Sequence, residues 1–152
     1  MASAMHPPAV AATLAAWHRM IASGDLARLP ALLHPDAVFR SPMTFKPYPG
    51  AATVALILNT VFGVFDGFAY HRELATDDGL SAVLEFSAEV NGKQLKGIDL
   101  IRFDADGRIT DFEVMVRPMS GLAALGEEMG KRVGPLLGAS LASSLAAFKP
   151  PG

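Results

Sequence analysis

The sequence predicts an α+β fold in which helices cover one face of a curved antiparallel sheet. Up to residue 65, apolar side chains recur at the three- to four-residue spacing of helices that bury one face. From residue 68 to 117 the spacing changes to two, and turn signals separate four extended segments. A curved sheet that is closed by helices encloses a cone-shaped apolar pocket, which we therefore expect here.

The first half of the chain is expected to hold three helices and one short strand. Leu14, Trp17 and Ile21 lie on one stripe at helical spacing. Gly24 follows as an end signal for this helix. The expected elements are a helix over 9–23, a short helix over 26–33, a strand over 37–41 and a third helix over 51–65.

The second half is expected to be an antiparallel meander followed by a helical tail. Asn91 and Gly92 form a strong signal for a two-residue hairpin turn, and Pro118 ends the last strand. The expected strands are 68–76, 80–90, 93–103 and 108–117, with the helical tail over 119–148. In the tail, Leu137, Leu141, Leu145 and Phe148 form one apolar helical stripe.

Composition excludes several classes of function. The 152 residues fit a single domain, with a core over about 9–118 and the tail beyond it. The absence of cysteine excludes disulfide scaffolds, thiolate metal sites and thiol catalysis. A net charge of −2 provides no basic excess for nucleic acid, and no uninterrupted apolar run is long enough to suggest a membrane partner. Without a charged segment at its N-terminus, the chain is expected to be cytoplasmic.

Strand register places one carboxylate in an apolar sheet face. The turn at Asn91–Gly92 sets Asp99 opposite Leu84. A four-residue turn over 104–107 sets Asp99 opposite Phe112 on its other side. Because side chains on one face recur every second residue, Phe86 and Val114 share the face of Asp99.

An acid in such a place has a distinctive chemistry. Burial disfavours its charged form and raises its pKa, so Asp99 can remain protonated and donate a hydrogen bond to a developing oxyanion. The structural alternatives are a hydrogen bond from Asp99 to a neighbouring helix, or exposure to solvent if the register slips by one residue. The four histidines show no metal-ligand spacing, so neither a metal nor another cofactor is expected.

The order of elements and several short motifs resemble the nuclear transport factor 2-like superfamily. This group includes ketosteroid isomerase, SnoaL-type polyketide cyclases and limonene epoxide hydrolase, and the resemblance covers about residues 9–118. The motifs are Gly24-Asp25-Leu26, His34-Pro35-Asp36-Ala37-Val38-Phe39, Gly50, Ile98-Asp99-Leu100-Ile101-Arg102-Phe103 and Gly107-Arg108-Ile109.

The resemblance implies roles for three positions. Asp99 matches the protonated Asp that binds the oxyanion in ketosteroid isomerase. Ser41 stands where the isomerase has its general-base Asp, and Trp17 stands where it has an oxyanion-binding Tyr. A serine hydroxyl is too weak a base to replace a carboxylate near neutral pH, so the resemblance leaves open whether this chain is an enzyme.

We therefore expect a protein that binds a small apolar, carbonyl-bearing molecule, with isomerase- or cyclase-like acid–base catalysis by Asp99. The alternative is a non-catalytic ligand-binding or protein-interaction module of the same fold. The residues expected to bind the substrate are Trp17, Phe39, Ser41, Leu58, Phe62, Leu84, Phe86, Phe112 and Val114.

The other face of the sheet suggests a second copy of the chain as a partner. Val83, Ile98 and Leu100 alternate there with Glu85 and Lys96. This face is too apolar for a fully solvated surface, so we expect a homodimer through the sheet.

Overall fold

The computed structural model describes residues 5–137, which form three α-helices, a short 3-10 helix and six strands. In chain order these elements are α1 (Pro8–Ser23), η2 (Leu29–Leu32), β1 (Leu33–Arg40), β2 (Tyr48–Pro49), α2 (Ala51–Val64), β3 (Asp66–Ala75), β4 (Ser81–Val90), β5 (Lys93–Phe103), β6 (Ile109–Arg117) and α3 (Met119–Leu137).

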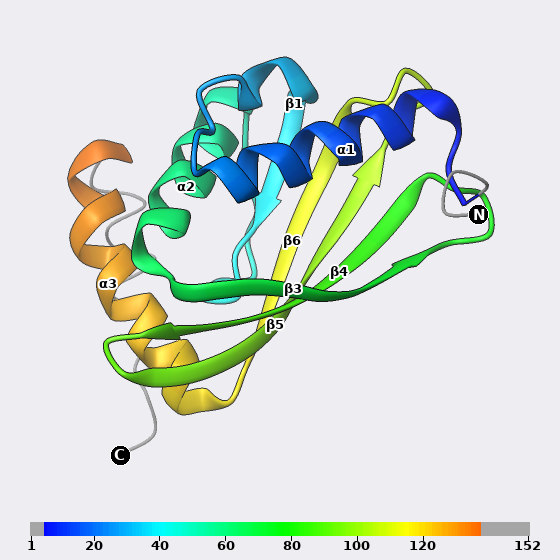
Figure 1. The fold of residues 1–152 in the computed structure, drawn as a ribbon. Helices are drawn as coiled ribbons and strands as arrows, with labels where there is room; N and C mark the ends of the chain where they lie inside the picture. The colour runs from blue at the N-terminus through cyan, green and yellow to red at the C-terminus, as the bar shows by residue number, and fades with distance from the viewer. Residues whose placement is uncertain (1–4, 138–152) are drawn as a thin grey trace.

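The strands form one curved, open sheet in the order β2-β1-β6-β5-β4-β3. Strands β3 to β6 are the predicted antiparallel meander, whereas β1 lies parallel to β6 and makes the whole sheet mixed. Helices α1 and α2 lie over one face, and α3 packs beside α2 across one end of the sheet (Figure 1). The predicted α+β class, with helices enclosing one face of a curved sheet, is confirmed.

The N-terminal helices follow their local signals with one exception. Gly24 adopts a φ of 75° and its N–H bonds to the Met20 carbonyl, which ends α1 where predicted. The expected second helix is reduced to the single turn η2, and Leu33 already begins β1. His34 and Pro35 therefore lie inside a strand instead of breaking the chain. Pairing of β1 with β6 overrides the weak helical pattern of this segment.

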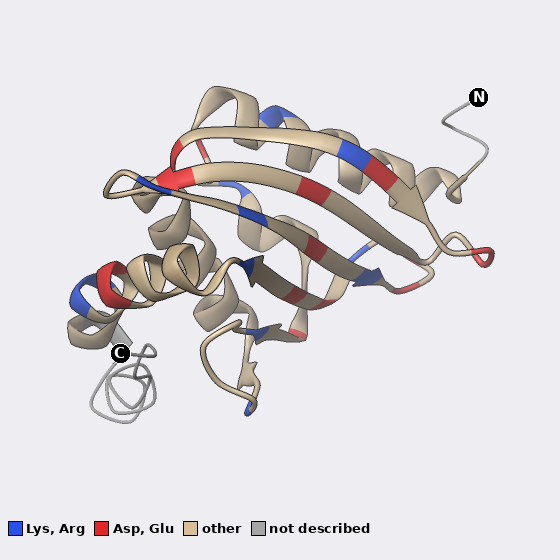
Figure 2. Ribbon diagram, turned by 90° about the horizontal axis from the view of Figure 1, so that it is seen from below, with Lys and Arg blue, Asp and Glu red and all other residues tan. Residues whose placement is uncertain are grey.

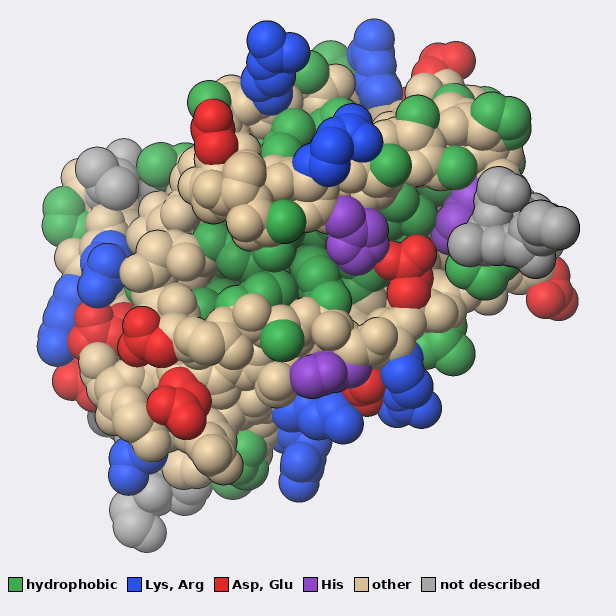
Figure 3. Space-filling model, viewed as in Figure 1, with side chains coloured by type: hydrophobic (Ala, Val, Ile, Leu, Met, Phe, Trp, Pro, Cys, Tyr) green, Lys and Arg blue, Asp and Glu red, His purple; other side chains and the backbone are tan. Residues whose placement is uncertain are grey.

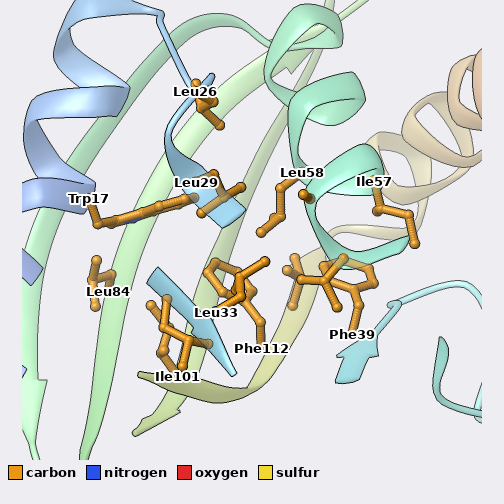
Figure 4. Close-up of a cluster of buried hydrophobic side chains, with 14 of the residues drawn as sticks. Trp17, Leu26, Leu29, Leu33, Phe39, Ile57, Leu58, Leu84, Ile101 and Phe112 are labelled. Carbon is orange, nitrogen blue, oxygen red and sulfur yellow. The ribbon is translucent and has the colours of Figure 1, made fainter. Parts of the chain in front are cut away.

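The core lies between the helices and the inner face of the sheet. Trp17 from α1, Leu58 from α2, and Leu84 and Phe112 from the sheet are all at most 1% exposed. Their side chains converge in Figure 4, and the rings of Trp17 and Phe112 meet edge to face at 5.3 Å. Each such side chain contributes about 1.5–3 kcal/mol through burial, so this cluster fixes the helices on the sheet.

One strand register differs from its prediction by two residues. Leu84 pairs with Asp99 as expected, but Asp99 pairs with Val114 instead of Phe112. The turn between β5 and β6 uses five residues, since Phe103 pairs with Ile109, and an adjacent irregularity adds a second one-residue offset. Together the two offsets shift the pairing by two residues, which is one full period of the side-chain alternation. Every side chain predicted on the inner face therefore stays on that face.

The predicted helical tail begins at Met119 as α3. The apolar stripe expected from Leu137 to Phe148 lies outside the part of the chain whose side chains the structure describes. No helix among the described residues is long and apolar enough to cross a membrane.

Charged residues of both signs are distributed along the strands of the sheet (Figure 2). On the outer face, Glu85 is only 7% exposed and forms ion pairs with Arg72 at 2.7 Å and with Lys96 at 3.1 Å. Hydrogen bonds first from Arg72 and then from Lys96 lower the pKa of Glu85 to about 2.

Candidate active site

An apolar cavity lies between the inner face of the sheet, α2 and α3. It offers about 40 Å³ to the centres of water-sized molecules, which is room for about three waters. The loop between β1 and β2 completes its wall. Its lining residues are Phe39, Ser41, Pro42, Met43, Tyr48, Ile57, Leu58, Val61, Phe62, Phe65, Phe86, Asp99, Val114, Leu125, Met129 and Val133.

Seven of the ten site residues predicted from the sequence line this cavity, namely Phe39, Ser41, Leu58, Phe62, Phe86, Asp99 and Val114. The other three, Trp17, Leu84 and Phe112, do not line it. They are completely buried in the adjacent core, where the ring of Trp17 packs against Phe62 and Phe112. These three residues therefore support the wall from behind.

The sequence reasoning missed the part of the wall that α3 supplies. Leu125, Met129 and Val133 recur every fourth residue, so they form one stripe of α3 that faces the cavity. That spacing was visible in the sequence. Nothing in the pattern showed that the tail folds back over the pocket.

Asp99 is the chemical centre of the cavity. It is 3% exposed, and one of its oxygens, Oδ2, accepts a hydrogen bond of 2.5 Å from the Tyr70 hydroxyl. Burial raises the pKa of Asp99 to about 7, and the hydrogen bond from Tyr70 opposes part of that rise. The raised pKa agrees in direction with the expectation from the sequence, and it brings the titration of this acid into the neutral pH range.

Tyr70 connects Asp99 to Trp17. The indole Nε1–H of Trp17 donates to the Tyr70 hydroxyl oxygen at 2.9 Å. An indole nitrogen can only donate, so the Tyr70 proton is left to point at Asp99 Oδ2. Burial, followed by the charge of Asp99, raises the pKa of Tyr70 well above its usual value, which keeps this donor protonated.

This chain of hydrogen bonds orients the acid. Because Oδ2 of Asp99 already accepts from Tyr70, a proton on Asp99 is favoured on Oδ1. Oδ1 has no hydrogen-bond partner among residues 5–137, and Asp99 lines the cavity. The arrangement can therefore present an acidic proton to an oxygen atom of a bound molecule.

Tyr70 was not identified from the sequence because it reaches Asp99 across an intervening strand. It lies on β3 opposite Phe86 of β4, whereas Asp99 lies on β5. Gly97, the β5 partner of Phe86, leaves room for that ring, since a Cβ there would lie 2.6 Å from the Phe86 ring. The two-residue alternation of Phe68 and Tyr70 was the available signal that Tyr70 faces inward.

Other polar groups at the cavity are neutral. The Ser41 oxygen accepts a hydrogen bond of 3.0 Å from the Met43 backbone N–H. The Tyr48 hydroxyl accepts one of 3.2 Å from Thr44. Asp99 is the only carboxylate among the lining residues that the structure describes, and residues 5–137 contain no group of three acidic or histidine side chains placed to hold a metal ion.

Comparisons with known proteins agree with this geometry. The model of the SnoaL-like domain matches residues 14–112, which is more than half of the chain. The chain belongs to the SnoaL-like domain family. This confirms the predicted relationship to the nuclear transport factor 2-like superfamily. No curated protein matched the sequence.

Solved structures of similar proteins support the same assignment. A crystal structure named as a steroid delta-isomerase from Pseudomonas aeruginosa is 66% identical, has a TM-score of 0.83, and is covered over 98% of its length by 93% of this chain. An uncharacterized protein with a cystatin-like fold from Silicibacter pomeroyi DSS-3 is 34% identical with a TM-score of 0.76, and the match covers 89% of this chain and 93% of that one. The epoxide hydrolase/cyclase-like enzyme SalBIII is 18% identical with a TM-score of 0.58 over 72% of this chain and 90% of that one, and shows the fold alone.

Proposed function

We propose that this SnoaL-like protein binds a small apolar ketone and catalyses proton transfer next to its carbonyl group, as in the shift of a carbon–carbon double bond. The observation that carries this proposal is Asp99, a buried acid that lines a mainly apolar cavity and whose Oδ1 has no hydrogen-bond partner among residues 5–137. An apolar pocket selects the hydrocarbon skeleton, and one acidic proton selects the oxygen.

In the proposed reaction, protonated Asp99 donates a hydrogen bond from Oδ1 to the carbonyl oxygen of the ligand. That bond strengthens as negative charge develops on the oxygen during enolisation, which lowers the barrier. The proton that leaves the carbon next to the carbonyl passes to a water molecule that contacts the bound ligand. Return of a proton to the far carbon of the conjugated system completes the double-bond shift, and Asp99 ends in its starting state.

The name of the similar Pseudomonas aeruginosa protein supports this class of reaction, because a steroid delta-isomerase moves a double bond in an apolar ring system. At 66% identity over nearly its whole length, a shared site is a reasonable basis for choosing probes. We therefore propose, as the first test substrate, a steroid ketone whose carbon–carbon double bond lies one position away from conjugation with the carbonyl group.

A second candidate function is ligand binding without turnover. It is favoured by the position of Ser41, since no second carboxylate accompanies Asp99 among the described lining residues. A ligand would then be held by the same hydrogen bond from Asp99, but its proton would not move at a useful rate.

The deciding experiment follows conversion of the steroid by its ultraviolet absorbance, and exchange of its α-protons in heavy water by NMR, between pH 5 and 9. The proposal expects both rates to fall as the pH rises through about 7, the pKa of Asp99, and to disappear in Asp99→Asn. Rates that rise through the same pH would instead make Asp99 the base. Binding without exchange at any pH would establish the second candidate.

A further inference from the structure

The loop between β1 and β2 is the least restrained part of the cavity wall. Ser41, Pro42 and Met43 of this loop line the cavity, and so does Tyr48, with which β2 begins. The lining otherwise comes from α2, α3 and the sheet, apart from Phe65 at the end of α2. Regular backbone hydrogen bonds hold the helices and the strands, so a movement that opens the cavity is easiest in the loop.

Few hydrogen bonds hold this loop in place. Among residues 5–137, no hydrogen bond joins the backbone of residues 42–46 to another backbone group. The side-chain hydrogen bonds of the loop end within it or on Tyr48. Phe45 at its tip is fully exposed and adds no buried contact. Hydrogen bonds therefore do not fix the loop against the rest of the molecule.

One side chain fastens the loop to α3. Met43 lies over Gly126 of this helix, where a Cβ would come 2.9 Å from the Met43 sulfur. Gly126 is buried, so the space left by its missing side chain is filled by the flexible thioether of Met43. The same helix supplies Leu125 and Met129 to the cavity wall. The contact between Met43 and Gly126 therefore closes the wall between the loop and α3.

The other thin part of the wall is the ring of Phe62. It lines the cavity and also the wide hollow between α1, α2 and β3, whose floor of hydrophobic side chains is visible in Figure 3. This ring is packed edge to face against Trp17 at 5.6 Å, Phe68 at 5.0 Å and Phe65 at 5.9 Å. Three aromatic partners restrain Phe62, so the loop needs the smaller change to open.

We propose that residues 41–47 form a gate over the cavity and that Met43, seated over Gly126, is its latch. An apolar molecule enters when Met43 leaves this seat and the loop turns about its ends at Ser41 and Tyr48. Opening is needed because the closed cavity, at about 40 Å³, is several times smaller than the roughly 300–1,000 Å³ of pockets for organic ligands. The gate controls the route into the cavity, so it does not depend on the chemistry that follows binding.

The first test measures access to the cavity without a ligand. The chain contains no cysteine, so Val114→Cys places a single thiol on the buried wall of the cavity. The rate at which methyl methanethiosulfonate modifies this thiol is measured alone and in combination with Gly126→Ala, with Met43→Ala, or with Gly63→Ala as the control.

The three added substitutions differ in their effect on the latch. A Cβ at Gly126 displaces the Met43 side chain, and Met43→Ala removes it, whereas a Cβ at Gly63 of α2 meets no atom within 4 Å. Because the thiol reacts only in the open state, its rate follows the open fraction. We expect that rate to rise about tenfold or more in both latch variants and to stay unchanged in the control.

The second test locks the gate. The Cγ of Met43, where a cysteine would carry its sulfur, lies 3.7 Å from a Cβ at Gly126, so Met43→Cys combined with Gly126→Cys can form a disulfide with a small adjustment. Binding of 2-acetylnaphthalene, a stable apolar ketone, is followed by the fluorescence of Trp17, the single tryptophan of the chain, which packs against Phe62 of the wall. Oxidation should slow association about tenfold or more, and reduction should restore it, with Met43→Cys alone as the control.

The outcomes separate the gate from the proposed function. Equal modification rates in all variants would overturn the gate, and so would a rise that only matches the loss of global stability in urea denaturation. Association that the oxidised disulfide leaves unchanged would also overturn it, since the ketone would then enter elsewhere, as past Phe62. If the ketone failed to bind to the wild type, the proposed function would fall, and the thiol modification rates would still confirm or refute the gate.

Discussion

Replacing Asp99 by Asn is the most informative single change in this protein. The Asn side chain has the shape of a protonated Asp, and its amide oxygen can still accept the hydrogen bond from Tyr70. The variant therefore removes the titration of residue 99 while preserving the packing around it.

The size of the effect on the free energy of unfolding follows from the pKa of Asp99, which lies at about 7 in the folded protein against an ordinary value of 3.8. A carboxyl group whose pKa is raised by folding destabilises the folded state as the pH rises through 3.8 towards about 7, and the full effect persists above both values. The full effect is about 4 kcal/mol, of which about 2.5 kcal/mol develops between pH 5 and pH 8. For a chain of this length that corresponds to about 5–10 °C in Tm.

The assay is urea denaturation of both proteins at pH 5 and pH 8, with Asp106→Asn as the control at an exposed turn carboxylate. Between pH 5 and pH 8, the free energy of unfolding of the wild type and of the control should fall by about 2.5 kcal/mol more than that of Asp99→Asn. If the stability difference between wild type and Asp99→Asn is the same at both pH values, the raised pKa is refuted. A loss of several kcal/mol in the Asn variant at pH 8 would instead make Asp99 a structural anion.

Two further substitutions test the surroundings of this acid, and a third experiment tests the outer face of the sheet. Tyr70→Phe removes a hydrogen bond that lowers the pKa of Asp99, so a carboxyl titration by NMR should place that pKa above its wild-type value; an unchanged pKa would contradict the hydrogen bond. Gly97→Ala would place a Cβ 2.6 Å from the Phe86 ring and against the Met115 carbonyl, and should cost about 1–3 kcal/mol in a denaturant melt, whereas an unaltered midpoint would show that the ring can yield. We also propose that the outer sheet face around Glu85 joins two copies of the chain, and light scattering at micromolar concentration should give twice the monomer mass; a monomer mass would refute this.

The sequence predicted the parts of this fold that local patterns control. Period-two alternation and the Asn91-Gly92 turn gave the pairing of Leu84 with Asp99 without error. The turn between β5 and β6 gave an incorrect register because neither its extra residue nor the adjacent irregularity has a clear signature in the sequence. The inner face of Asp99 was still predicted correctly, since the two offsets cancel in alternation.

What could not be predicted is contact between residues that neither pair across neighbouring strands nor share a helix. Tyr70 and Asp99 lie on β3 and β5, so their hydrogen bond depends on how far the sheet curves over β4. The same applies to α3, whose position over the cavity is set by packing against α2 and not by its own sequence pattern. Strand register therefore predicts the position of Asp99 on the inner face, but it does not predict the residues that orient this acid.

That distinction changes the role expected for Trp17. Matched by sequence to a tyrosine that binds an oxyanion, it would point its N–H at the ligand, but in the structure that N–H is used by Tyr70. Trp17 is fully buried and does not line the cavity, so under the proposed function it would act on a ligand only through the orientation of Tyr70 and Asp99. The acidic proton of this site is thus positioned by two successive hydrogen bonds from α1 through β3 to β5, and the helix and the sheet must both be in place before Asp99 can present it to a ligand.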